Sequence, residues 1–260
     1  MVNAEKTDNK TFIFRKEILD HGYVELIDVM GSDDAIVNAA RTSYDKGTKS
    51  ISSTKILVRY LMRHKHLGPF EFCECVFRIR CPLFVARQWF RHRTGNYNEA
   101  SLRYSEAQDE YYIPLREHIT TQNRRNKQAR TETVVEDADE IQKTMKNDAK
   151  LVFKHYRNYL DKGVAREIAR NNIPLSYYTS FVFKMDLRNL LNFLTLRFDS
   201  HAQYEIRLYA IEMLEMIRNY FPITVSAWED YIKNGITLSR SELDLLRMVF
   251  KNNNLLIRKL

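Results

Sequence analysis

Hydrophobic residues recur every three or four positions along much of the chain, which is the spacing of amphipathic α-helices. Ser32 or Asp33 can cap the first predicted helix, and Asp186 can cap a later one, because short polar side chains accept hydrogen bonds from a helix N-terminus. Pro82 suits a first helical position. The predicted helices cover residues 32–44, 53–67, 82–93, 141–162, 164–171, 187–198 and 200–221.

Other segments alternate between apolar and polar residues or are rich in β-formers, which predicts strands. One or two strands are expected over 12–30, one over 71–81 and one over 176–185, and the chain after Gly95 is expected to be extended. Helices and strands neither alternate strictly nor separate into blocks, so we predict an α+β fold, helix-rich and built as a single domain.

Two segments stand apart from that domain, which we expect to span residues 1–221. Residues 116–140 are charged and poor in apolar side chains, so they are predicted to form a surface excursion. Residues 222–260 read as a helical C-terminal appendage with a basic end.

Composition and charge narrow the possible partners. The 260 residues are 44% hydrophobic, enough for a full core, and the formal net charge of +8 favours anionic ligands. No stretch approaches the length of a membrane span, and the polar N-terminus lacks the apolar core of a secretory signal. Three cysteines alternate along one predicted strand, Cys73, Cys75 and Cys81, so we expect buried free thiols, no metal site and a cytoplasmic location.

Several phosphate- and cofactor-binding motifs are absent from the sequence. It contains no G-x-x-x-x-G-K-[ST], G-x-G-x-x-G, G-x-S-x-G or H-E-x-x-H. Any phosphate group must therefore be bound by side chains instead of a glycine-rich loop.

The stretch "QWFRHRTGNYNEASLRYS", residues 88–105, concentrates basic residues in a polar loop. A helix over 82–93 would place Gln88, Arg91 and His92 on one face. An extended segment after Gly95 would place Glu99, Ser101 and Arg103 on one side. If the stretch is a solvated basic turn, that explains the arginines but not the residues between them. A phosphate site also explains the interleaved amide, carboxylate and hydroxyl groups, because guanidinium and hydroxyl groups match phosphate oxygens.

Ser101 raises the question of a nucleophile, which would need an adjacent base and an orienting partner. No acid is placed to complete a triad with the nearest histidine, so a positioning hydroxyl is favoured. Elsewhere, Arg166 and Arg170 lie one turn apart and alone would be surface arginines. Asn192, Arg197 and His201 interrupt a strongly apolar helix pair.

Taken together, these segments resemble the flavin-dependent thymidylate synthases. "RHRTGNYNEAS" fits the RHR-x7-S signature of that family and continues as "LRYS". "HLGPFEF", "YYIP", "AREIARNNIPL" and "LRNLLNFLTLRFDSHAQYEIR" resemble further family segments in the same order, over roughly residues 35–215.

The resemblance implies an activity and partners. Members of the family make dTMP from dUMP, with 5,10-methylenetetrahydrofolate as carbon donor, FAD as hydride carrier and NADPH as reductant. They have a mainly antiparallel sheet and form homotetramers whose sites several subunits share. We accordingly expect no nucleic-acid or membrane partner.

The resemblance also implies roles for individual residues. Arg197 would contact the pyrimidine, favour its N3-ionised form and act as the catalytic residue. The residues expected to bind dUMP are Gln88, Arg91, Glu99, Ala100, Ser101, Leu102, Arg103, Arg170 and Arg197. Those expected to bind FAD are Ser43, His66, Gly68, Glu71, Arg91, His92, Arg93, Asn98, Glu99, Asp186, Leu187, Arg188, Asn192 and His201.

One position departs from the family pattern, since Asp186 stands where the family often has Asn. As a helix cap Asp serves as well as Asn, but a carboxylate cannot donate a hydrogen bond to FAD and would repel its diphosphate. Two other functions remain open at this point. A basic nucleic-acid-binding module would also use arginine clusters, and another flavin- or nucleotide-dependent transferase would keep the same site with a different substrate.

Overall fold

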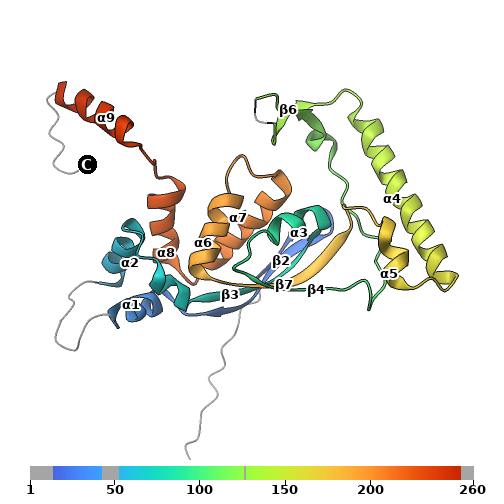
Figure 1. The fold of residues 1–260 in the computed structure, drawn as a ribbon, viewed down its shortest axis with the longest axis horizontal. Helices are drawn as coiled ribbons and strands as arrows, with labels where there is room; N and C mark the ends of the chain where they lie inside the picture. Colours follow the sequence, from blue (N-terminus) through green and yellow to red (C-terminus); the bar gives the residue numbers. More distant parts are fainter. Residues whose placement is uncertain (1–13, 43–52, 126, 253–260) are drawn as a thin grey trace, which may run out of the picture.

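The computed structural model describes residues 14–42, 53–125 and 127–252, so Ser43 lies outside the described residues. An antiparallel five-stranded sheet in the order β1-β2-β3-β7-β4 forms its centre (Figure 1). A separate pair of antiparallel strands, β5 and β6, lies beyond it. The strands are β1 (Phe14–Ile18), β2 (Gly22–Met30), β3 (Glu74–Pro82), β4 (Asn96–Glu99), β5 (Thr120–Gln122), β6 (Arg130–Val134) and β7 (Tyr178–Asp186).

Helices pack against this sheet and extend beyond both of its ends (Figure 1). The helices α3, α6 and α7 contact its strands, whereas α4 runs at the end opposite α1 and α2. The helices are α1 (Asp33–Arg41), α2 (Thr54–Arg63), α3 (Leu83–Trp89), α4 (Ala138–Asp161), α5 (Arg166–Ala169), α6 (Leu187–Arg197), α7 (Tyr204–Arg218), α8 (Pro222–Trp228) and α9 (Arg240–Asn252). The predicted helix-rich α+β fold with an antiparallel sheet is confirmed.

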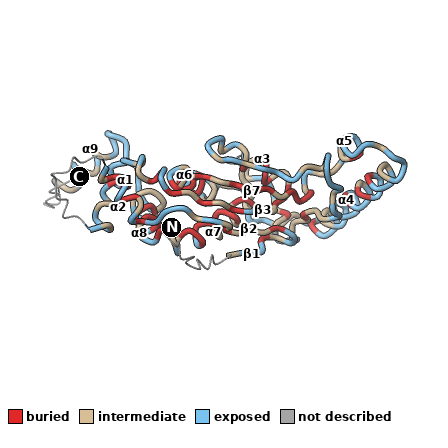
Figure 2. Tube along the Cα trace, turned by 90° about the horizontal axis from the view of Figure 1, so that it is seen from below, coloured by how far each residue is buried: buried red, intermediate tan, exposed pale blue. Residues whose placement is uncertain are grey.

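The main core lies between the sheet and its helices. Buried residues gather along the sheet and in α6 and α7, while α4 is largely exposed (Figure 2). Cys75, Phe77 and Ile79 alternate inward from β3, as the period of two requires, and pack beside Phe183 of β7. The three cysteines are free and buried, as predicted.

A second, smaller hydrophobic cluster joins α4 and α5 to the sheet. Its buried members include Phe153 and Tyr156 of α4, Ala169 of α5 and Tyr177 just before β7. Because β7 also lies in the main core, its N-terminal end connects the two clusters. This junction is where the largest group of predicted nucleotide-binding residues lies.

Several predicted element boundaries were wrong. The second helix stops at Arg63, earlier than the end predicted at residue 67. Just beyond it, Lys65 adopts a left-handed φ of 57° and the His66 amide donates to the Leu61 carbonyl at 2.9 Å, which is a local way to end a helix. Residues Gly68–Phe72 form a 3₁₀ turn, so the strand predicted from residue 71 begins at Glu74. The third helix ends at Trp89 and does not reach residue 93.

The predicted surface excursion contains regular structure. Residues 116–140 hold a 3₁₀ turn, the β5–β6 pair and the first turn of α4. The division of the chain at residue 221 stays a prediction, and in the segment after it Val225 and Trp228 of α8 are fully buried in the main core. No helix in the described part of the chain is long and apolar enough to span a membrane.

Asp33 connects α1 to α8 and gives a testable prediction about stability. Its buried carboxylate accepts hydrogen bonds from the amides of Ile223 at 2.8 Å and Thr224 at 3.0 Å, and from the Thr224 hydroxyl at 2.6 Å. Asp33→Ala would leave these donors buried and unpaired, so the free energy of unfolding should fall by about 2–4 kcal/mol. Urea unfolding measures the loss.

The neighbouring Asp34 provides the control. It is exposed and bonds only to the Thr54 hydroxyl at 2.7 Å among the described residues. Asp34→Ala should therefore change the free energy of unfolding by about 0.5 kcal/mol. If both substitutions lowered the free energy of unfolding equally, the hydrogen bonds from α8 to Asp33 would not be what stabilises the contact between α1 and α8.

Candidate functional site

The basic run after α3 follows a tight turn that rests on the sheet. The Tyr97 hydroxyl donates to the His92 carbonyl at 2.7 Å, and the Gly95 amide donates to the same carbonyl at 3.2 Å. A Cβ on Gly95 would lie 2.6 Å from the Phe183 ring, so glycine permits this close approach. The turn leaves Arg91 and Arg93 exposed, and among the described residues neither has an acidic partner.

His92 points the other way and meets Arg197 at the end of α6. The Arg197 Nε donates to His92 Nε2 at 2.9 Å, and a terminal guanidinium nitrogen donates to the Gln88 carbonyl at 3.2 Å. The Gln88 side chain in turn hydrogen-bonds the side chain of Gln203. Arg197 is thus in one hydrogen-bond network with Gln88 and His92, although it is far from both in the sequence.

Burial controls the charges in this network. Burial, with a smaller contribution from the Arg197 charge, lowers the pKa of His92 to about 4. The imidazole is therefore neutral at pH 7, and its Nε2 can accept the hydrogen bond from Arg197. Burial also lowers the pKa of Arg197, and no described acidic group lies within ion-pair distance of it. The structure therefore holds a partly buried guanidinium whose charge is not neutralised, as a site for an anionic ligand requires.

The depressed pKa of His92 predicts a pH-dependent loss of stability. In the unfolded state His92 is protonated below about pH 6.5, whereas in the folded state it is protonated only below about pH 4. The full stability is therefore present above pH 6.5, and part of it is lost as the pH falls to about 4. The expected loss is on the order of 2–3 kcal/mol. His92→Gln still accepts from Arg197 but does not titrate. Urea unfolding across this window should show a steeper decline for the unsubstituted protein, and parallel curves would contradict the assignment.

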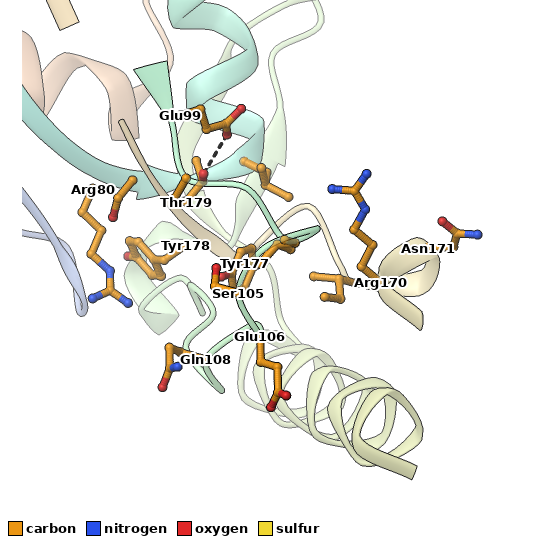
Figure 3. A pocket seen from close by; sticks show the side chains of 15 residues that line it. Arg80, Glu99, Ser105, Glu106, Gln108, Arg170, Asn171, Tyr177, Tyr178 and Thr179 are labelled. Carbon is orange, nitrogen blue, oxygen red and sulfur yellow. Dashed lines mark hydrogen bonds between the residues drawn. The ribbon is translucent and has the colours of Figure 1, made fainter. Parts of the chain in front are cut away.

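A second group of predicted residues lines a pocket of about 480 Å³ at the junction of the two hydrophobic clusters. Glu99, Ala100, Leu102 and Arg170 line the pocket, and Arg170 belongs to a 3₁₀ turn after α5. Figure 3 shows Glu99 and Arg170 well apart around it. Other lining residues are Arg80, Leu83, Ser105, Glu106, Gln108, Asn171, Ile173, Tyr177, Tyr178, Thr179 and Ser180.

Ser101 and Arg103 lie beside this pocket, in a turn. The expectation of an extended segment was wrong beyond Ala100, because the amides of Tyr104 and Ser105 both donate to the Ser101 carbonyl, at 3.0 and 3.1 Å. The Ser101 hydroxyl accepts from the Arg103 amide at 3.2 Å. The exposed Arg103 side chain forms an ion pair with Glu167 at 3.1 Å.

A third group gathers where the 3₁₀ turn Gly68–Phe72 meets the start of α6. Arg188 forms an ion pair with Glu71, and the Leu187 amide donates to the Cys73 carbonyl at 2.8 Å. Both Asp186 carboxylate oxygens bond to Asn189, at 2.9 Å to its amide and 2.7 Å to its side chain, so the predicted helix cap is confirmed. The His66 ring lies near the rings of Tyr60 and His64 in tilted and edge-on arrangements, and Asn192 is exposed on α6.

The remaining predicted residues are more scattered. His201 is exposed and bonds to Asp199 at 2.8 Å, in the loop between α6 and α7. It lines a polar pocket of about 690 Å³ against the β5–β6 pair. Asn98 is exposed on β4. Among the described residues no group of three or more metal-ligating side chains comes together.

Sequence reasoning missed two polar residues of these groups. Gln203 contacts Gln88, and Thr179 donates to the Glu99 carboxylate at 2.6 Å. Thr179 lies on the inward face of β7 with Phe181, Phe183 and Met185, so the available signal was a polar residue on the otherwise apolar face of that strand.

Comparison with known proteins decides the family. The family model described as thymidylate synthase complementing protein matches residues 25–223. The chain belongs to the flavin-dependent thymidylate synthase family. A flavin-dependent thymidylate synthase of Wolbachia pipientis wMel is 49% identical over 239 residues, which cover 92% of this chain and 84% of that protein. One from Rickettsia bellii is 44% identical over 245 residues, covering 89% and 83%. The resemblance inferred from the motifs is confirmed, and the chain is an enzyme of this family.

A solved structure supports the fold assignment. The UMP/dUMP methylase PolB from Streptomyces cacaoi, bound with 5-Br UMP, is similar to this chain with a TM-score of 0.74 and 33% identity over 82% of this chain and 96% of PolB. The same enzyme bound with 5-Br dUMP gives a TM-score of 0.74 and 32% identity.

Proposed function

We propose that this family member makes dTMP from dUMP, with 5,10-methylenetetrahydrofolate as carbon donor, FAD as hydride carrier and NADPH as reductant. The similarity to PolB, a UMP/dUMP methylase, supports a pyrimidine monophosphate as substrate. The observation that carries the proposal is the pair of arginine-bearing groups, the pocket with Arg170 and the network with Arg197.

The pocket at the cluster junction would bind the nucleotide. The Arg170 guanidinium suits a phosphate, since charge-assisted hydrogen bonds of this kind each contribute about 1.5–3 kcal/mol. The Ser101 hydroxyl, the Leu102 backbone amide and the Arg103 guanidinium would supply further donors from the adjacent turn. The Glu99 carboxylate accepts hydrogen bonds only, so it would bind a donor of the nucleotide.

The residues proposed for FAD fit a dinucleotide in part. Arg91 and Arg93 are exposed guanidinium groups that have no described acidic partner, as the diphosphate requires. Asp186 does not fit as a donor, because it is an acceptor and both its oxygens already bond to Asn189. Its role would be to cap α6. Leu187 is fully buried and its amide already donates to the Cys73 carbonyl, so within this group Arg188 and Asn192 would be left to face the cofactor. When bound, FAD supplies the redox chemistry that the side chains lack.

Arg197 would act on the pyrimidine through its charge. A guanidinium held in a partly dehydrated site stabilises negative charge on N3 and the carbonyl oxygens more strongly than the same group in water. Neutral His92 holds the Nε side of the guanidinium. Since Nη2 donates one hydrogen bond to the Gln88 carbonyl, Nη1 and the remaining N–H of Nη2 would be left for the substrate.

A complete site would require more than one copy of the chain. Arg170 lines the pocket with Glu99, but Arg197 and Gln88 do not line it. Each chain would therefore carry two partial sites, and a symmetric oligomer can bring the Arg170 half of one copy to the Arg197 half of another. We accordingly propose the homotetramer with shared active sites.

A product assay tests the proposed reaction. The purified protein should bind added FAD and turn yellow, and should form dTMP from dUMP when methylenetetrahydrofolate, FAD and NADPH are all present. Leaving out any one component should abolish product. Formation of dTMP without NADPH would remove the reductant from the proposal, and a colourless protein that forms no dTMP from the full mixture would overturn it.

A further inference from the structure

The Glu99 carboxylate is held at the pocket by one hydrogen bond from the strand beneath it. The Thr179 hydroxyl donates to Glu99 Oε1 at 2.6 Å, and Figure 3 shows this bond at the edge of the pocket. Glu99 is exposed, whereas Thr179 is only 5% exposed. A short bond to an ionised acceptor is among the stronger hydrogen bonds.

Thr179 is a rigid support for this bond. It lies in β7, between β3 and β4, and pairs with Cys81 of β3. Its branched side chain has few rotamers, and burial restricts it further. Glu99, by contrast, ends the edge strand β4, where the Ala100 amide bonds to the Ser180 carbonyl at 2.8 Å. The backbone of Glu99 is therefore fixed, but its long side chain depends on Thr179 for its orientation.

The second carboxylate oxygen, Oε2, has no hydrogen-bond partner among the described residues. We propose that Thr179 is a positioning residue that turns Glu99 Oε2 toward the sugar hydroxyl of the bound nucleotide. This inference rests on the proposed function. At neutral pH dUMP carries two donors, the 3′-hydroxyl and N3–H, since its phosphate is ionised. Because N3 is assigned to Arg197, the 3′-hydroxyl is the donor left for Glu99.

Nucleotide analogues test the inference directly. Calorimetry would give the Kd of two nucleotides, dUMP and 2′,3′-dideoxyuridine monophosphate, which lacks the 3′-hydroxyl. Both would be measured with the unsubstituted protein and with the variants Thr179→Val and Thr179→Ser. Thr179→Val keeps the shape but not the hydroxyl, so it should raise the Kd of dUMP about tenfold. Thr179→Ser should stay within about threefold. The Kd of the dideoxy analogue should be the same for all three proteins, because the contact is absent from it.

Each other outcome overturns the inference in a recognisable way. Equal weakening of both nucleotides by Thr179→Val would show a structural role for Thr179. Unchanged dUMP binding would show that Glu99 does not depend on it. Glu99→Gln removes the negative charge of the acceptor, so it should likewise weaken the binding of dUMP and leave the binding of the dideoxy analogue unchanged. An unsubstituted protein that binds neither nucleotide would overturn the proposed function itself.

Discussion

Arg197→Ala is expected to lower kcat by about 10²–10³-fold, which is the loss seen when one donor to a developing anion is removed. The side chain is partly buried, its pKa is lowered by burial, and no described carboxylate neutralises it. An arginine kept under these conditions weakens the fold more than it supports it. The free energy of unfolding should therefore change by about 1 kcal/mol or less, although bonds to His92 and Gln88 are lost.

Steady-state kinetics and urea unfolding of the same preparation separate the two effects. Arg78→Ala provides a matched control, because that guanidinium pairs with Glu25 of β2 at 2.9 Å and neither lines the Arg170 pocket nor bonds to Arg197. The control should keep its kcat. A parallel collapse of stability and activity in Arg197→Ala would instead make Arg197 a structural residue.

Mixing two inactive variants is expected to restore activity if sites are shared between subunits. Arg170→Ala and Arg197→Ala should each be nearly inactive alone, since each lacks one half of every site. In a mixed pair, one of the two sites receives both intact arginines. Random assembly of co-expressed chains should therefore recover about a quarter of the unsubstituted activity.

The control for this experiment uses two residues of the same pocket. Arg170 and Glu99 line one pocket of one chain, so co-expression of Arg170→Ala with Glu99→Ala places a defect in every site of a mixed pair. No activity beyond that of the two variants alone should appear. Absence of recovery in the first mixture, with mixed oligomers verified by differential tags, would place Arg170 and Arg197 in the site of a single chain.

Local sequence determined the elements and much of the candidate chemistry. The periods of three to four and of two identified most helices and the strands of the central sheet, although not β5 and β6. Ser32 and Asp186 were recognised as caps because capping needs only a short polar side chain beside the helix start. The RHR stretch identified the family because its residues are close together in the chain. Motifs of this kind depend on little beyond local order.

Element ends were not predictable in the same way. The helix over 82–93 has no internal stop signal, and it ends at Trp89 where the His92 carbonyl accepts from Tyr97 and Gly95 packs on Phe183. The turn at Ser101 likewise replaces an expected extended segment. The helix end depends on contacts with the sheet, and the turn at Ser101 depends on backbone hydrogen bonds from Tyr104 and Ser105. The pattern of apolar and polar residues shows neither.

The sequence by itself thus determined which side chains are available for binding anions, and the tertiary structure alone decided which of them meet. His92 bonds to Arg197 across 105 positions, and Glu99 bonds to Thr179 across 80. Such pairs form because the sheet brings β7 beside β4 and packing brings the end of α6 to the end of α3. The pKa of His92 and the division of the arginines into two groups follow from that packing, since burial and proximity are properties of the folded chain.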